Sequence, residues 1–176
     1  SIPSLKAIGN ALGRGGFMYK NKWLDVTGMV SYITCWNCAA TVSVTEVING
    51  QSETLDHTAQ YGMGNLGFNF DGNMHWGGFN LHLMCTIQDP KYKNYDNTFV
   101  FSDGSTKTIS YNGKYSTGIS RVELEIDPSY KYKDWRFWLS ARYFSRQYAS
   151  RTNLAYFDGR WETFGGVDWN IIKGLK

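Results

Sequence analysis

The chain has 176 residues, a formal net charge of +3, 16% aromatic residues, 19 glycines and only 3 prolines. This composition suits an all-β protein that is either one domain or a piece of a larger one, and so small a charge without a basic run argues against nucleic acid as a partner. No window approaches the ~18 uninterrupted apolar residues of a membrane-spanning helix.

Apolar and polar residues begin to alternate with a period of two early in the chain. Phe17 and Tyr19 lead through a short reversal at 20–22 into residues 23–33, where Leu24 and Val26 open an apolar series on every second position. Such alternation predicts β-strands that differ in polarity between their two faces.

The clearest hairpin is predicted over residues 61–88. Its two arms alternate, and the Asp-Gly-Asn sequence at 71–73 predicts a tight type II′ reversal. Directly opposed residues of an antiparallel pair share a face, and Phe68 is predicted to lie opposite Cys85.

Three further alternating stretches follow at 121–127, 135–143 and 161–171, which makes seven in all. Within the connection between the fourth and fifth stretches, Asp103-Gly104-Ser105 predicts a small hairpin that joins residues 98–102 to residues 107–111.

The connections between the stretches alternate in length. Tight turns are predicted near residues 21, 72, 133 and 173, and long connections at 34–57, 89–118 and 149–159. The predicted strands run to about 11 to 14 residues, whereas strands in globular domains have ~5–6 and a membrane-crossing strand needs ~9–11. We therefore predict an antiparallel transmembrane β-barrel meander of about seven or eight strands, with short periplasmic turns and long extracellular loops. Residues 1–14 are predicted as a lead-in segment and 15–176 as barrel wall.

The two faces of the predicted wall differ in chemistry. The residues assigned to the lipid face are Leu66, Phe68, Leu81, Leu83, Leu124, Phe137 and Leu139. Those assigned to the lumen wall are Glu123, Glu125, Arg136, Arg142, Arg146, Arg160 and Glu162. Arg142 is expected opposite Glu123 or, if the register moves by two, opposite Glu125, so it meets a carboxylate in either case.

Four stretches of sequence resemble the barrel of TonB-dependent outer-membrane receptors, most closely the branch that imports glycans and other nutrients beneath a surface lipoprotein. They are MYKNKWL at 18–24, IQDPKY at 87–92, LSARYFSR at 139–146 and YFDGRWETFGGVDW at 156–169. The resemblance implies a location in the bacterial outer membrane, contact with its lipids, and a surface lipoprotein, a plug domain and TonB as partners. Receptors of this family close a barrel of about 22 strands around the plug. Neither a plug nor a TonB-contacting segment is recognisable in the sequence, so transport by this chain alone is not expected.

Aromatic residues of the predicted loops are candidates for stacking against a sugar ligand. They are Tyr92, Tyr95, Phe99, Tyr111, Tyr115 and Tyr156. The alternative is that these rings pack the outer loops against each other.

Cys35 and Cys38 form a CxxC motif that is a candidate disulfide if it lies at the outer end of the barrel. No second CxxC or closely spaced histidine pair follows, so no metal site is predicted. No cofactor and no catalytic site are predicted either, although some small outer-membrane barrels modify lipids.

Two other functions fit the same alternation. One is a soluble β-sandwich or calyx that binds sugars or lipids. The other is a small complete outer-membrane barrel with a structural or adhesive role, for which residues 1–12 or the connection at 89–118 would supply an eighth strand.

Overall fold

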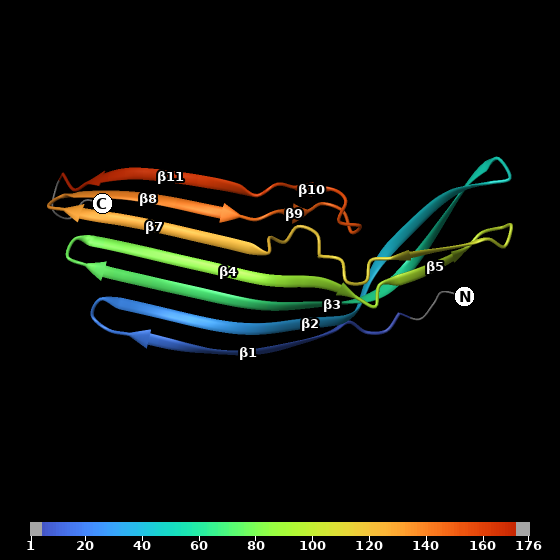
Figure 1. The fold of residues 1–176 in the computed structure, drawn as a ribbon, viewed down its shortest axis with the longest axis horizontal. Helices are drawn as coiled ribbons and strands as arrows, with labels where there is room; N and C mark the ends of the chain where they lie inside the picture. Colours follow the sequence, from blue (N-terminus) through green and yellow to red (C-terminus); the bar gives the residue numbers. More distant parts are fainter. Residues whose placement is uncertain (1–4, 172–176) are drawn as a thin grey trace.

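A computed structural model describes residues 5–171, and it contains one large antiparallel sheet. Seven strands follow one another across it as a meander (Figure 1). They are β1 (Gly9–Lys20), β2 (Leu24–Ile48), β3 (Gln51–Trp76), β4 (Phe79–Lys93), β7 (Val122–Tyr132), β8 (Trp135–Phe144) and β11 (Arg160–Trp169). The predicted all-β antiparallel barrel wall is confirmed in its fold class, and over the described residues the sheet is open, with β1 and β11 as its edges.

Two small hairpins lie between strands of the large sheet. Strands β5 (Asp96–Val100) and β6 (Thr106–Ser110) pair with each other, which confirms the hairpin predicted around residue 104. Strands β9 (Gln147–Tyr148) and β10 (Tyr156–Phe157) form the other. Within the described part of the chain, no helix has both the length and the apolar character needed to cross a membrane.

The turn predicted at 71–73 is wrong, because β3 continues to Trp76 and the chain reverses at Gly77 and Gly78. Gly77 has a φ of 58°, a conformation that glycine adopts without steric cost. Phe68 consequently lies opposite Ile87, not Cys85. The faces are unchanged, because the pairing moved by two residues.

Gly72 was predicted to lie in the turn, but it lies within β3, between the neighbouring strands β2 and β4. A Cβ placed on it would lie 3.0 Å from the ring of Phe70 and 3.4 Å from Val26. The pairing of β3 with β2 extends to Met74 opposite Leu24. Continued pairing on both sides therefore overrides the local turn signal of Asp-Gly-Asn.

Strand β1 begins at Gly9, inside the segment 1–14 that was predicted to precede the wall, so that boundary is corrected. Gly9 pairs with Trp36, and a Cβ on Gly9 would lie 2.4 Å from the indole ring. The indole of Trp36 thus packs directly over the glycine backbone.

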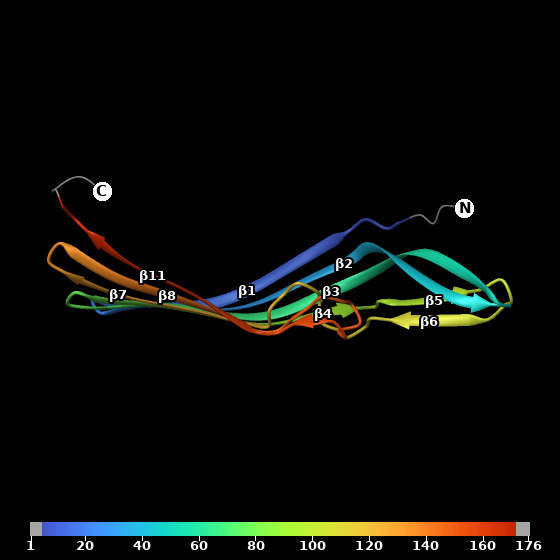
Figure 2. The ribbon, with the colours of Figure 1, turned by 90° about the horizontal axis from the view of Figure 1, so that it is seen from above.

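Strands β2 and β3 are 25 and 26 residues long, so most of the predicted loop at 34–57 is strand. Beyond a β-bulge between Cys35 and Cys38 their outer halves leave the direction of the wall (Figures 1 and 2). They pack against the β5–β6 hairpin, and we call residues 38–61 together with 95–111 the tower. Ser102 Oγ donates a hydrogen bond of 2.6 Å to Glu53, and Lys107 forms an ion pair with Glu46 across this contact.

The apolar core of the described chain lies in and beside the tower, not in the wall. Its buried members are Val42, Val44, Ala59, Tyr92, Tyr95, Phe99 and Phe101. The rings of Tyr61 and Tyr95 stack with centroids 4.2 Å apart, and Tyr92 and Tyr111 meet Tyr95 edge to face at 5.4 and 5.0 Å. Stacked and edge-to-face rings of this kind add specific stabilisation to their buried area.

The wall is a single layer whose two faces differ. The strand registers place all seven residues assigned to the lipid face on one side of it. Leu66 and Leu139 are 56% and 44% exposed, and no second layer covers this face among the described residues. A soluble sandwich would bury these side chains, and a small complete barrel would close the sheet, so neither alternative describes residues 5–171.

Candidate functional site on the polar face

The opposite face of the wall carries paired charges. Glu125 lies opposite Arg142 with an N–O distance of 3.1 Å, which selects one of the two predicted registers. Arg160 pairs with Glu162 at 2.9 Å. Partly exposed pairs of this kind each stabilise a fold by about 0–1 kcal/mol, so their main effect is to set the polarity of the face.

Six of the seven residues assigned to the lumen wall share this face. Arg136 also belongs to it and lies 3.7 Å from Asp168. Arg146 is the exception, because β8 ends at Phe144. Its guanidinium lies 3.4 Å from Asp158 and 3.8 Å from the ring centroid of Tyr156, outside the sheet.

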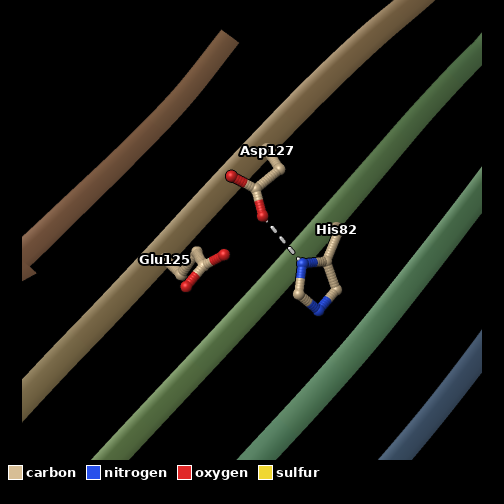
Figure 3. A group of neighbouring side chains, drawn as sticks. All are labelled: His82, Glu125 and Asp127. Atoms are coloured by element: carbon tan, nitrogen blue, oxygen red, sulfur yellow. Dashed lines mark hydrogen bonds and ion pairs between the residues drawn. The ribbon is translucent and has the colours of Figure 1, made fainter. Parts of the chain in front are cut away.

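A cluster around His82 lies on the polar face, on the middle strand of the sheet. His82 on β4 is directly opposite Asp127 on β7, and Asp71 approaches from β3 on the other side. The imidazole Nδ1 lies 2.9 Å from an Asp127 oxygen, and Nε2 lies 3.0 Å from an Asp71 oxygen (Figure 3 shows the Asp127 contact). Glu125 precedes Asp127 by two residues on β7, so the two side chains share a face.

His82, Glu125 and Asp127 are the one group of potential metal ligands found among residues 5–171, with donor atoms within 4.8 Å of one another. One imidazole nitrogen and two carboxylates form a ligand set suited to a divalent transition metal. Both His82 nitrogens, however, already contact aspartates, and Glu125 is paired with Arg142. Most donor atoms of the cluster are therefore already engaged, and a metal that uses His82 would have to displace an aspartate from one of its ring nitrogens.

An open groove of about 520 Å³ lies over this cluster. Its lining includes His82, Glu125, Asp127, Arg136, Trp138 and Arg142. The mixture of carboxylates, guanidinium groups and an indole can bind a polar ligand or a charged protein surface through hydrogen bonds.

The cluster around His82 was not predicted from the sequence. The two aspartates come from neighbouring strands 11 and 45 residues away in sequence. Asp71 was also predicted to lie in a turn, which removed it from the strand beside His82. Only the correct pairing of β3, β4 and β7 would have indicated that these three side chains meet.

The six aromatic ligand candidates do not form one binding surface. Tyr95, Phe99 and Tyr92 are 0%, 4% and 5% exposed and belong to the core beside the tower. Their rings therefore pack the tower, as the alternative interpretation expected, and offer no face to a ligand.

The remaining candidates lie in separate surroundings. Tyr111 is half-buried against Tyr95, whereas Tyr115 stacks on Tyr148 with centroids 5.7 Å apart. The guanidinium of Arg121 lies 4.5 Å from the ring centroid of Tyr115. Tyr156 is 47% exposed. Of the six, Tyr156 has the most accessible ring.

The three cysteines of the chain are thiols in the structure. Cys85 lies opposite Phe70 and Leu124 on the apolar face, where it acts as a small apolar side chain. Cys38 lies in the tower, beyond the first ~10 residues of β2 that would suffice to cross a membrane. Burial, and secondarily the neighbouring Cys35 thiol, raise the pKa of Cys38 to about 11.

No protein-family model and no curated protein matches the chain. Among solved structures it is similar to the FrpB iron transporter from Neisseria meningitidis, in the F3-3 variant and in the apoprotein form of the F5-1 variant. Each comparison has a TM-score of 0.62 and 14% sequence identity, and covers 94% of this chain. The chain spans 24% of the length of either match, so the likeness concerns the fold of one part of those proteins.

Proposed function

We propose that the chain forms part of the wall of a TonB-dependent receptor barrel that imports a nutrient across a bacterial outer membrane. The observation that carries the proposal is the single-layer antiparallel meander, with one continuous apolar face exposed and one face of paired charges. Hydrocarbon tails are the medium that fits the first face, and a wet lumen fits the second.

The asymmetry of the two ends supports an orientation. One end carries short turns such as 77–78 and 133–134, and the other carries the tower. Outer-membrane barrels place short turns in the periplasm and long loops outside. The tower would then be an extracellular structure.

The proposed role is non-catalytic, and this segment is not expected to transport a cargo alone. In such a receptor a plug domain would lie against the polar face, TonB would act on the plug, and a surface lipoprotein would cover the outer loops. Glycan import has less support than import in general. The buried rings of Tyr92, Tyr95 and Phe99 remove half of the proposed sugar-stacking surface, and the similar structures bear the name of an iron transporter.

Spin labels on neighbouring residues of β8 test the membrane assignment. Leu139 and Ser140 point to opposite faces, so each is replaced by cysteine in a chain whose native cysteines are serine, then labelled and reconstituted into phospholipid vesicles. A label at Leu139→Cys should be relaxed by oxygen, which concentrates in lipid, and a label at Ser140→Cys by a water-soluble nickel chelate. Equal access of the chelate to both positions would contradict the proposal.

A further inference from the structure

The bulge of β2 brings two cysteines onto the same face of the sheet. Cys35 pairs with Met63 and Cys38 pairs with Tyr61, so two residues of β2 stand opposite the single residue Gly62. In a regular strand, positions three apart point to opposite faces. Here the bulge adds one residue to β2, so Cys35 and Cys38 leave the same face. Their partners Met63 and Tyr61 are two positions apart and share that face.

The spacing across the bulge is compatible with a bond between the two sulfurs. Their partners on β3 are two residues apart, which corresponds to ~6.6 Å along a strand. Bridged cysteines have Cα atoms about 4.4–6.8 Å apart. Both side chains also leave the same face, so no rotation of the strand is needed.

Several contacts fix the bulge in place. Asn37 has a φ of 57°, and its side-chain amide donates a hydrogen bond of 2.9 Å to the carbonyl of Ala7. A Cβ on Gly62 would lie 3.1 Å from the carbonyl oxygen of Cys35, so glycine permits the close approach of the two backbones. The geometry that makes the cysteines neighbours is thus held by contacts on both sides of β2.

One of the two thiols borders a surface hollow. A pocket of about 190 Å³ is lined by Cys35, Trp36, Tyr61 and Lys93, among others, and Cys38 does not line it. A small thiol reagent can therefore reach Cys35 first. Cys38 lies opposite Tyr61, which packs against the aromatic core.

We propose that Cys35 and Cys38 form an oxidation site that closes reversibly to a disulfide and thereby fixes the junction between wall and tower. The oxidant is a low-molecular-weight disulfide. The Cys35 thiolate attacks one sulfur of the oxidant and releases one thiolate. The Cys38 thiolate then attacks the Cys35 sulfur of the mixed disulfide and releases the second. The pair loses two electrons, the oxidant gains them, and the two cysteine protons pass to the two released thiols.

The disulfide would form at the junction between the wall and the tower. Outside the bulge, β2 and β3 are regularly paired, and the tower leaves the direction of the wall at this point (Figure 2). Closing residues 35–38 into a small ring restricts the backbone at the one irregular step of this ladder. The tower should then be held more rigidly on the wall. The inference rests on the register of β2 and β3 and does not depend on the proposed import.

The test oxidises the folded chain in detergent micelles with glutathione buffers of increasing oxidised fraction, followed by alkylation and intact-mass analysis. We expect loss of two hydrogen atoms, mapped to the peptide that contains Cys35 and Cys38, and reversal by excess reduced glutathione. Hydrogen exchange of amides in residues 36–62 should be slower in the oxidised chain. Cys85→Ser should change neither result.

Cys38→Ser separates the internal bond from simple adduct formation, because it should retain one glutathione on Cys35. Separate glutathione adducts on both cysteines of the native chain would overturn the proposal. An internal bond that leaves the exchange of residues 36–62 unchanged would overturn the locking role. Neither outcome bears on the membrane assignment of the two faces, which the spin-label measurement tests separately.

Discussion

His82 shows how one residue can organise a face of a sheet. Its two ring nitrogens contact carboxylates from both neighbouring strands, at 2.9 and 3.0 Å. Without the imidazole, Asp71 and Asp127 would face each other across β4 with no hydrogen-bonding side chain between them. Like charges at such spacing repel, and the lost hydrogen bonds leave polar atoms without partners.

We therefore expect His82→Ala to lower the free energy of unfolding by about 1–2 kcal/mol. Denaturant unfolding in detergent micelles, followed by tryptophan fluorescence, measures the change. His75→Ala is the matched control, because His75 lies near the turn and contacts only the amide of Asn80. Equal losses in both variants would contradict an organising role for His82.

Cys38 makes a second prediction at this scale. Its pKa of about 11 leaves little thiolate at neutral pH, so alkylation should be slow and should accelerate as the pH rises toward 11. The variant with Cys35→Ser and Cys85→Ser isolates Cys38, since burial is the larger cause of the shift. Iodoacetamide rates are compared between the folded chain and the chain in denaturant, where a cysteine has an ordinary pKa of ~8.5. Equal rates in the two states at pH 8 would contradict burial.

At the scale of the element, the proposed membrane position requires each strand of the wall to face lipid on one side and water on the other. Leu139 and Ser140 are neighbours near the middle of β8, and only Leu139 lies on the exposed apolar face. If the wall lies in a membrane as proposed, Leu139→Arg should reduce its stability by about 2–4 kcal/mol, the cost of arginine on a lipid face near the midplane.

Ser140→Arg places the same charge on the polar face, where Asp127 and Glu125 line the groove, and it should cost much less. Unfolding from lipid vesicles compares the two variants. If Ser140→Arg were the more harmful substitution, the assignment of the faces would be reversed.

The elements also show what alternation can and cannot predict. It located the seven strands of the sheet, because a period of two is a property of each strand alone. It placed the reversal of β3 at Asp71-Gly72-Asn73, since a local turn signal carries no information about pairing with β2. The true reversal at Gly77 follows from where both neighbouring ladders end.

The tower was not predicted from the sequence, for a related reason. Val42 and Val44 alternate with Ser43 and Thr45, but these residues fall within the long connection that was predicted at 34–57. Its core depends on rings from β4 and β5, such as Tyr92 and Phe99, which only the folded arrangement brings together. Contacts between distant segments therefore decided most of what the sequence missed, including the His82 cluster.

At the scale of the whole molecule, the large sheet is paired throughout its interior and open at its two edges over the described residues. The interior of the sheet is continuously paired, whereas the outer side of β1 and the outer side of β11 have no partner among the described residues. Unpaired strand edges are surfaces on which other strands add. The exposed rings of Phe17 on β1 and Trp161 on β11 increase the apolar area along these two borders.

The odd number of strands gives these borders a polarity. In a seven-strand meander the first and last strands point the same way, here toward the end with the short turns (Figure 1). Rotation of a second copy about the membrane normal preserves that direction, so the borders of two like-oriented copies would meet in parallel. To close this sheet into a ring that is antiparallel throughout, a second and different meander would have to pair with both borders. Its first and last strands would point toward the end with the tower, so it would have an odd number of strands. The total number of strands would then be even, as in bacterial single-chain barrels.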